Sequence, residues 1–230
     1  GFAVAPDAKL AEKKNVGIDL KVVDEQKAVA ADARPTAVVA LRPKLPRWRE
    51  AHEHDYMIVV DSSQSMVGER YTRATELTQR LVEQMDRRDR FSVMACDSEC
   101  RELGAMRAPS IGAAKDASVW LGQQPAAGAS DIVSSIRTAA GKLAADGQRE
   151  RWVIFVGDGF ASTGFRKAGD VEAAISASTQ GVNVSTIGLG TDADSAVLGA
   201  VARGGGGSYL AWVPGQSVKT AAMASLESTF

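Results

Sequence analysis

The sequence predicts a doubly wound α/β fold, in which a mostly parallel sheet lies between two layers of helices. Residues 57–60 and 152–156 are fully apolar runs, which is typical of strands buried on both faces of a sheet. Segments with a helical spacing of apolar residues alternate with these and other strand-like runs along the chain. This alternation predicts βαβ crossovers and therefore a three-layer α/β/α sandwich.

The expected elements follow one another in a regular order. After the first strand, which ends at Asp61, helical spacing predicts a helix over residues 69–85. Residues 91–95 form the next strand, and residues 99–103 are short enough to be its antiparallel partner at the edge of the sheet. Further helices are expected over residues 111–121, 131–145, 171–179, 195–203 and 216–228, and further strands over residues 152–156, 182–189 and 208–213.

The first fifty residues differ from the remainder. Residues 16–22 and 36–42 read as two short strands, and residues 43–50 contain two prolines and read as a linker. Two strands seldom form a stable unit alone, so these either extend the main sheet or belong to a neighbouring β-rich domain. We therefore divide the chain into a short N-terminal β extension with its linker, residues 1–50, and a main domain, residues 51–230.

Both histidines of the chain lie at the junction of these two parts. His52 and His54 form a His-x-His pair, which is a spacing found in metal sites. No cysteine or further histidine lies near them in the sequence. We therefore expect both histidines to be solvated linker residues rather than ligands.

Composition disfavours several classes of function. Lys and Arg number 27 against 28 Asp and Glu, so the formal net charge of −1 gives no electrostatic reason to expect nucleic acid or an anionic membrane as a partner. No apolar run approaches the length of a bilayer span. The chain shows no signal peptide and begins and ends abruptly, so we expect a fragment of a longer protein with a neighbouring domain.

Polar side chains follow the two apolar strands and precede one helix. Asp61, Ser63 and Ser65 alternate after the first strand, Asp158 follows the second, and Ser130 stands just before the helix expected from residue 131. In a doubly wound sheet these three loops open at one edge. Two carboxylates and three hydroxyls are hard oxygen donors, which suit Mg²⁺, Mn²⁺ or Ca²⁺. The alternative interpretation is that they are ordinary strand ends and helix caps.

These residues resemble the metal-ion-dependent adhesion site of von Willebrand factor type A domains, which have a Rossmann-like fold. The resemblance is carried by Asp61-x-Ser63-x-Ser65, by the Gly-Ala-Ser-Asp loop at Ser130, and by the apolar strand that ends in Gly-Asp-Gly at Asp158. It covers roughly residues 55–228. The preceding strands are similar to the bacterial, inter-alpha-trypsin-inhibitor-like branch, in which a β-rich VIT domain comes before the A domain.

The resemblance implies a role for each of these oxygens. Ser63 and Ser65 would bind the metal directly, and Ser130 would do so where the family usually has threonine. Asp61 and Asp158 would act mostly through bound water. The metal ligands implied are therefore Asp61, Ser63, Ser65, Ser130 and Asp158.

The resemblance also implies a rim that faces a partner. Gln64, Asp131 and Phe160 are expected there. Gly157 and Phe160 differ from the Thr-Asp-Gly-Glu motif that is common in the family. This difference retains the carboxylate of Asp158 but changes its surroundings.

The function implied is a non-enzymatic adhesion or interaction module that captures an acidic residue of a partner protein. Neutral hydroxyl ligands leave most of the charge on the cation, so a partner's Asp or Glu can complete its coordination. A lysine or arginine in the hollow among the oxygens would argue against this interpretation. The alternative is an assembly scaffold of the kind associated with AAA ATPases. A metal-dependent hydrolase is disfavoured because the metal loops have no histidine and the chain has no Gly-x-Ser-x-Gly elbow.

The two cysteines leave two interpretations open. Cys96 and Cys100 flank the turn of the expected hairpin and can pair across it, which would favour the cell envelope or the extracellular space over the cytoplasm. Alternatively they are buried free thiols, since cysteine also behaves as a small apolar residue.

Overall fold

The computed structural model describes residues 53–143, 145 and 149–227. The strands and linker expected over residues 1–50, the VIT-like extension and His52 all lie outside the described residues.

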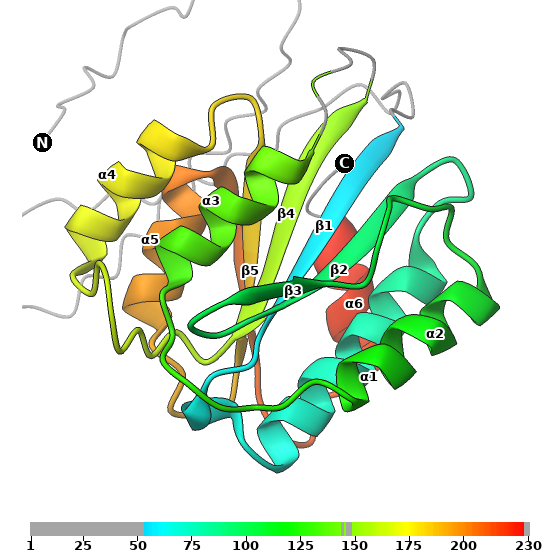
Figure 1. Cartoon of the computed structure of the whole chain (residues 1–230), viewed down its shortest axis with the longest axis horizontal. Coiled ribbons are helices and arrows are strands. Elements are labelled where there is room, and N and C mark those ends of the chain that lie inside the picture. Colours follow the sequence, from blue (N-terminus) through cyan, green and yellow to red (C-terminus); the bar gives the residue numbers. More distant parts are fainter. Residues whose placement is uncertain (1–52, 144, 146–148, 228–230) are drawn as a thin grey trace, which may run out of the picture. The chain divides into compact units, whose positions relative to one another are not determined.

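Six strands form one sheet in the order β3-β2-β1-β4-β5-β6 (Figure 1). β2 and β3 pair antiparallel, and every other neighbouring pair is parallel. The prediction of a mostly parallel sheet with one antiparallel edge strand is therefore confirmed. The strands are β1 (His54–Asp61), β2 (Arg90–Cys96), β3 (Cys100–Glu102), β4 (Glu150–Gly157), β5 (Asn183–Leu189) and β6 (Gly206–Trp212).

Helices cover both faces of the sheet. α1, α2 and α6 lie on one face, and α3, α4 and α5 lie on the other (Figure 1). The three-layer sandwich predicted from the alternation of elements is thus confirmed. The helices are α1 (Glu69–Gln84), α2 (Ile111–Gly122), α3 (Ile132–Lys142), α4 (Ala168–Ser178), α5 (Ser195–Gly204) and α6 (Val218–Glu227), and a short 3₁₀ helix η1 (Gln64–Met66) follows β1.

The central strand β1 shows why the sequence has a continuous apolar run at this point. Every residue of β1 is buried. Ile58 and Val60 pack into the core under α1, α2 and α6, whereas Met57 and Val59 pack into the core under α3, α4 and α5. The middle of a strand that meets helices on both faces therefore carries apolar side chains at successive positions, as residues 57–60 do.

Three helices begin at a residue that caps the free backbone N–H groups of the first turn. Ser110 accepts a hydrogen bond from the backbone N–H of Ala113 at the start of α2, and Asp131 does so from Ser134 at the start of α3. Asp194 accepts two such bonds at the start of α5. These caps fix the starting points of the helices, and therefore the shape of the loops before them.

The expectation of solvated histidines is wrong for His54. His54 is the first residue of β1, is 2% exposed, and has its Nδ1 3.0 Å from Oδ1 of Asp89. Its backbone N–H also donates to Asp89. The strand begins before the apolar run because its polar first residues are buried with partners from distant parts of the chain.

Candidate functional site

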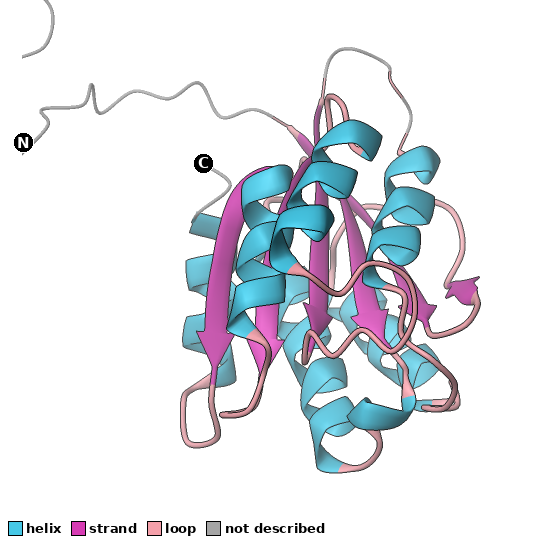
Figure 2. Ribbon diagram, turned by 90° about the vertical axis from the view of Figure 1, so that its left-hand side faces the viewer, coloured by secondary structure: helices cyan, strands magenta, loops and turns pink. Residues whose placement is uncertain are grey.

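The polar loops meet at the carboxyl edge of the sheet, at the point where the strand order reverses. β1 lies between β2 and β4, and Val60 of β1 pairs with Val156 of β4. Asp61 ends β1, and Asp158 directly follows the last residue of β4. Figure 2 shows the parallel strands pointing in one direction, so their following loops share one edge. This is where open α/β sheets place their ligands.

Asp61 is the centre of the contacts within the site. Its Oδ1 accepts a hydrogen bond from the backbone N–H of Ser63 at 2.8 Å, and its Oδ2 accepts one from the hydroxyl of Ser130 at 3.0 Å. Ser130 is 69 residues away in the sequence. The hydroxyls of Ser63 and Ser65 lie 3.1 Å apart. The loop after β1 and the loop that precedes α3 therefore meet at the carboxylate of Asp61.

Backbone hydrogen bonds also hold these loops together. The N–H of Gln64 donates to the carbonyl of Gly128 at 3.0 Å, and the N–H of Ala127 donates to the carbonyl of Ser62 at 2.8 Å. The N–H of Ser130 donates to the hydroxyl of Ser162 at 2.8 Å. The loop that precedes α3 is thus tied to the loop after β1 on one side and to the loop after β4 on the other.

Gly157 lets the end of β4 run close against Asp61. A Cβ at this position would lie 2.8 Å from Cβ of Asp61 and 2.9 Å from a ring carbon of Phe155. The space that a larger side chain would need at this position is therefore filled by the side chains of Asp61 and Phe155.

The carboxyl groups of the site are buried, which makes their charges costly. Asp61 is 1% exposed and Asp158 is 0% exposed. Burial and, to a smaller extent, the negative charge of Asp158 raise the pKa of Asp61 to about 6, although hydrogen bonds from Ser63 and Ser130 act in the opposite direction. A nearby cation would relieve this cost.

The donor set fits a hard divalent cation. Two carboxylates and three hydroxyls supply oxygens only, as Mg²⁺, Mn²⁺ and Ca²⁺ prefer. Over the described ranges, no group of three or more His, Cys, Asp or Glu side chains is placed to hold a metal ion. A cation at this site would therefore depend on the serine hydroxyls together with Asp61 and Asp158.

A basic side chain lies at the site, contrary to the open hollow that the metal interpretation requires. Nη1 of Arg70 donates to Oδ2 of Asp158 at 2.6 Å and to the carbonyl of Ser65 at 3.3 Å. Nη2 of Arg70 donates to both carboxylate oxygens of Asp192, at 2.7 and 2.9 Å. One of the two buried carboxylates is thus already paired, and a metal ion would have to share or displace this guanidinium.

The sequence offered one weak signal for Arg70. It lies in the first turn of α1, where the helix macrodipole disfavours a positive charge. A basic residue there is better tolerated when a carboxylate neutralises it. The carboxylates that do so, Asp158 and Asp192, are 88 and 122 residues away, so the sequence did not identify them.

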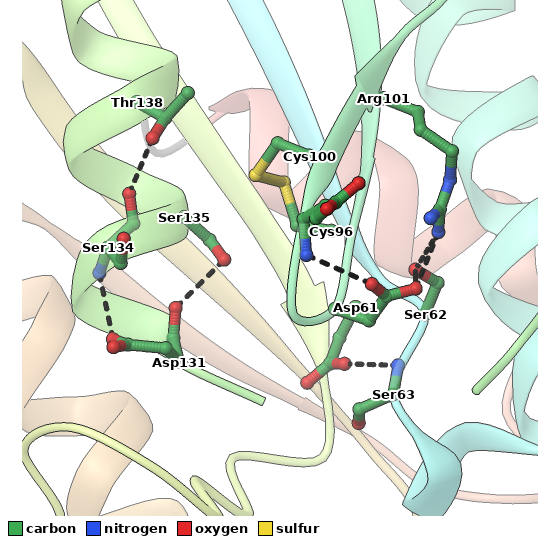
Figure 3. Close-up of a disulfide and its surroundings, with 12 residues drawn as sticks. Asp61, Ser62, Ser63, Cys96, Cys100, Arg101, Asp131, Ser134, Ser135 and Thr138 are labelled. Carbon is green, nitrogen blue, oxygen red and sulfur yellow. Dashed lines mark hydrogen bonds and ion pairs between the residues drawn. A yellow bond between two sulfur atoms is a disulfide. The ribbon is translucent and has the colours of Figure 1, made fainter. Parts of the chain in front are cut away.

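The three expected rim residues differ in their surroundings. Gln64 is exposed, and Phe160 is 42% exposed beside Asp158, whose Oδ1 accepts its backbone N–H at 3.0 Å. Asp131 instead uses its carboxylate as the cap of α3, bonded to Ser134 at 3.0 Å (Figure 3). Gln64 and Phe160 therefore present more free surface to a partner than Asp131 does.

Cys96 and Cys100 are joined by a disulfide that closes the hairpin between β2 and β3 (Figure 3). Asp97, within the hairpin, accepts hydrogen bonds from the hydroxyl of Ser62 at 3.2 Å and from Arg101 at 2.6 Å.

The hairpin also contacts the loop that precedes α3. The hydroxyl of Ser98 accepts the backbone N–H of Ala129 at 3.1 Å. A Cβ at Gly128, whose φ is +88°, would lie 3.0 Å from the same hydroxyl. The disulfide-closed hairpin therefore touches the residues next to Asp61 and next to Ser130.

A profile of the von Willebrand factor type A domain family matches residues 54–210 of the chain. No curated protein matches the sequence.

Several solved structures share the fold. An aerotolerance-related membrane protein from Bacteroides fragilis is 19% identical, with a TM-score of 0.64 over 76% of this chain and 98% of that chain. BatB from Bacteroides thetaiotaomicron is also 19% identical, with a TM-score of 0.61 over 76% and 96%. The von Willebrand factor domain of the type V pili tip protein Mfa5 from Porphyromonas gingivalis is 12% identical, with a TM-score of 0.60 over 78% and 96%.

Proposed function

This chain belongs to the von Willebrand factor type A domain family, and we propose that its domain is a metal-dependent module for binding another protein. In the proposal, Asp61, Ser63, Ser65, Ser130 and Asp158 hold a divalent cation, with Mg²⁺ as the first candidate. The cation captures the carboxylate of an Asp or Glu on the partner.

The observation that carries the proposal is the contact between Asp61 and Ser130. These residues come from loops 69 residues apart, and their 3.0 Å hydrogen bond brings a buried carboxylate and a hydroxyl to the edge where Asp158 also lies. Helix capping alone would not require residues of three loops to converge. A shared cation gives a physical reason for gathering these oxygens.

The chemistry of the donors favours capture of an acid over catalysis. Neutral hydroxyls leave most of the cation's charge available, and a unit charge pair at 4 Å near a surface already attracts by roughly 4 kcal/mol before desolvation. A divalent ion roughly doubles that attraction. Of the two histidines, the described one, His54, is bonded to Asp89 at the opposite end of β1, so it offers no base to a metal-bound water. We therefore propose a binding role and no catalytic one.

The disulfide supports a location in an oxidising compartment. Disulfides persist in the cell envelope and outside the cell, and they are rare in the reducing cytosol. The described part of the chain contains no helix that is both long enough and apolar enough to cross a membrane. We propose that the domain works in the cell envelope or outside the cell.

The proposal is tested with an array of random peptides that is probed by the full chain in Mg²⁺ and again in EDTA. Peptides that contain Asp or Glu should be retained in Mg²⁺, and their binding should disappear in EDTA and in Ser63→Ala. Ser178→Ala is the matched control, because Ser178 lies at the end of α4, where its hydroxyl only bonds the carbonyls of its own helix. Equal retention of peptides with and without the chelator would exclude a metal-dependent mechanism.

A further inference from the structure

Arg70 is the chain's own positive partner for a buried carboxylate of the site. Its Nη1 lies 2.6 Å from Oδ2 of Asp158, and the side chain of Asp158 is 0% exposed. A buried carboxylate needs a hydrogen-bonded counter-charge, because water no longer stabilises it. Arg70 therefore does for Asp158 what a metal ion would do.

The same guanidinium also has an anchor at the surface. Its Nη2 bonds both oxygens of Asp192, at 2.7 and 2.9 Å, and the side chain of Asp192 is 60% exposed. Arg70 is 23% exposed and lies between a buried partner and an exposed one. It can leave Asp158 without losing its whole set of hydrogen bonds.

There is space for such a movement. A cavity of about 370 Å³ adjoins the site, because Ser65 and Arg70 are both among its lining residues. The lining also includes Asp192, Leu189, Trp212 and Pro214. A guanidinium that withdraws from Asp158 toward Asp192 can move within this cavity without opening the core.

We propose that Arg70 competes with the divalent cation for Asp158, so that the cation binds only when Arg70 withdraws toward Asp192. This inference rests on the proposed function, because it concerns the same metal site. Two positive groups beside one buried carboxylate repel each other strongly where the effective dielectric constant is low. Arginine stays protonated in proteins, so displacement is the means by which this competitor is removed.

Competition makes a prediction whose direction is opposite to that of an ordinary ligand mutation. Removing a metal ligand weakens cation binding, whereas removing a competing charge strengthens it. Coupling between two ligands of one protein is usually worth roughly 5- to 150-fold in affinity. We therefore expect Arg70→Gln to bind the cation tighter than wild type by a factor in this range.

The experiment is a calorimetric titration of Mn²⁺ into the full chain in the absence of any partner protein. Arg70→Gln should bind Mn²⁺ more tightly than wild type. Arg70→Lys, which keeps the charge, should remain closer to wild type than to Arg70→Gln. Arg73→Gln is the matched control, because Arg73 lies on the same helix and pairs with Glu69 and Glu76 instead of the site; it should match wild type.

The possible outcomes separate this inference from the proposed function. If wild type and Arg70→Gln bind Mn²⁺ with equal affinity, or the variant binds more weakly, the competition is refuted while the metal site stands. If neither protein binds Mn²⁺, the proposed function fails, and the inference fails with it. Tighter binding by both Arg70→Gln and Arg73→Gln would also refute the inference, because it would reflect only the loss of positive charge.

A second measurement on the wild-type chain covers the case in which Arg70→Gln does not fold. The side-chain N–H resonances of Arg70 and Arg73 are followed by NMR while Mg²⁺ is added. The resonance of Arg70 should shift in proportion to the cation bound, and that of Arg73 should stay in place. Saturation with Mg²⁺ without a shift at Arg70 would refute the inference.

Discussion

Asp55 shows how this fold keeps a charged residue inside its sheet. It is the second residue of β1 and is 1% exposed. Arg90 contacts its carboxylate at 2.8 and 2.5 Å, and Nε of Arg149 does so at 2.7 Å. Burial works against its charge, but the hydrogen bonds from the two arginines outweigh burial and hold the pKa of Asp55 below its ordinary value.

This arrangement predicts a pH-dependent effect of Asp55→Asn. The pKa of Asp55 in the folded state lies below its unfolded value of about 3.9, so the native state binds fewer protons in acid than the unfolded chain does. The stability that the ionised carboxylate of Asp55 gives to the fold is therefore present above the unfolded pKa and is lost as the pH falls through the folded pKa. At pH 7 we expect Asp55→Asn to lower the free energy of unfolding by roughly 2–3 kcal/mol, since Arg149, which is largely buried, loses one of its two carboxylate partners and keeps only Glu53.

Urea unfolding of both proteins at pH 7 and near pH 3 checks this prediction. The difference between them should shrink in acid. Asp86→Asn serves as the control, because Asp86 forms an exposed pair with Arg88 and its loss should change little. A difference that stays constant down to pH 3 would show that the pairing of Asp55 with the arginines is not what stabilises this part of the sheet.

At the residue scale, the sequence predicted which oxygens gather at the carboxyl edge of the sheet, but not the charges around them. The placement of Asp61, Ser63 and Asp158 at this edge could be predicted because apolar runs mark where strands end, and residues at the ends of parallel strands share one edge. Arg70 could not be placed on Asp158, because an ion pair across 88 residues leaves no local pattern. The partner of His54, Asp89, was missed for the same reason.

At the element scale, the order and type of the described helices and strands agree with the sequence, and several boundaries do not. α3 ends at Lys142, before the predicted end at residue 145, because Leu143 leaves the helical conformation and is buried. α4 begins at Ala168, three residues before the predicted start at 171. Apolar periodicity identifies the buried face of a helix, but packing and caps decide where the helix ends.

The hairpin of β2 and β3 combines an element of the fold with support for the site. Its disulfide joins Cys96 to Cys100, and its turn residues Asp97 and Ser98 bond Ser62 and Ala129, each of which is next to an expected metal ligand. The hairpin should therefore hold the loop after β1 and the loop before α3 in position. A disulfide elsewhere on the sheet would not have this role.

Replacing both cysteines by serine should therefore have two effects. Opening a loop of this length costs about 2 kcal/mol of stability in the chain-entropy account, which urea unfolding measures. Affinity for Mn²⁺ should also fall, because the loops at Asp61 and Ser130 lose a fixed support. Dithiothreitol should produce the same two changes in wild type and neither in the double variant. A loss of stability with unchanged Mn²⁺ affinity would mean that the hairpin only stabilises the fold.

At the scale of the whole molecule, the described residues build two hydrophobic cores, one on each face of the sheet. The core under α1, α2 and α6 includes Leu77 and Leu121, and the core under α3, α4 and α5 includes Ile136 and Leu198. The sequence predicted these layers correctly because alternating strands and helices have few ways to pack. How the first fifty residues relate to this domain stays a prediction.

The two interpretations of residues 1–50 make opposite predictions for a chain that begins at Ala51. Within the described part of the chain, β3 and β6 are the edges of the sheet, and a strand from the N-terminal segment would have to pair with one of them if it extended the sheet. Deleting residues 1–50 would then expose an edge and lower the stability of the domain. If those residues belong to a neighbouring domain, as we expect, both cores remain complete and the urea midpoint of the shortened chain should equal that of the full chain.

Hydrogen exchange gives the sharper measurement, because amides of β6 such as those of Tyr209 and Leu210 should be protected equally in both chains. Faster exchange of these amides after the deletion would show that the boundary at residue 50 is wrong.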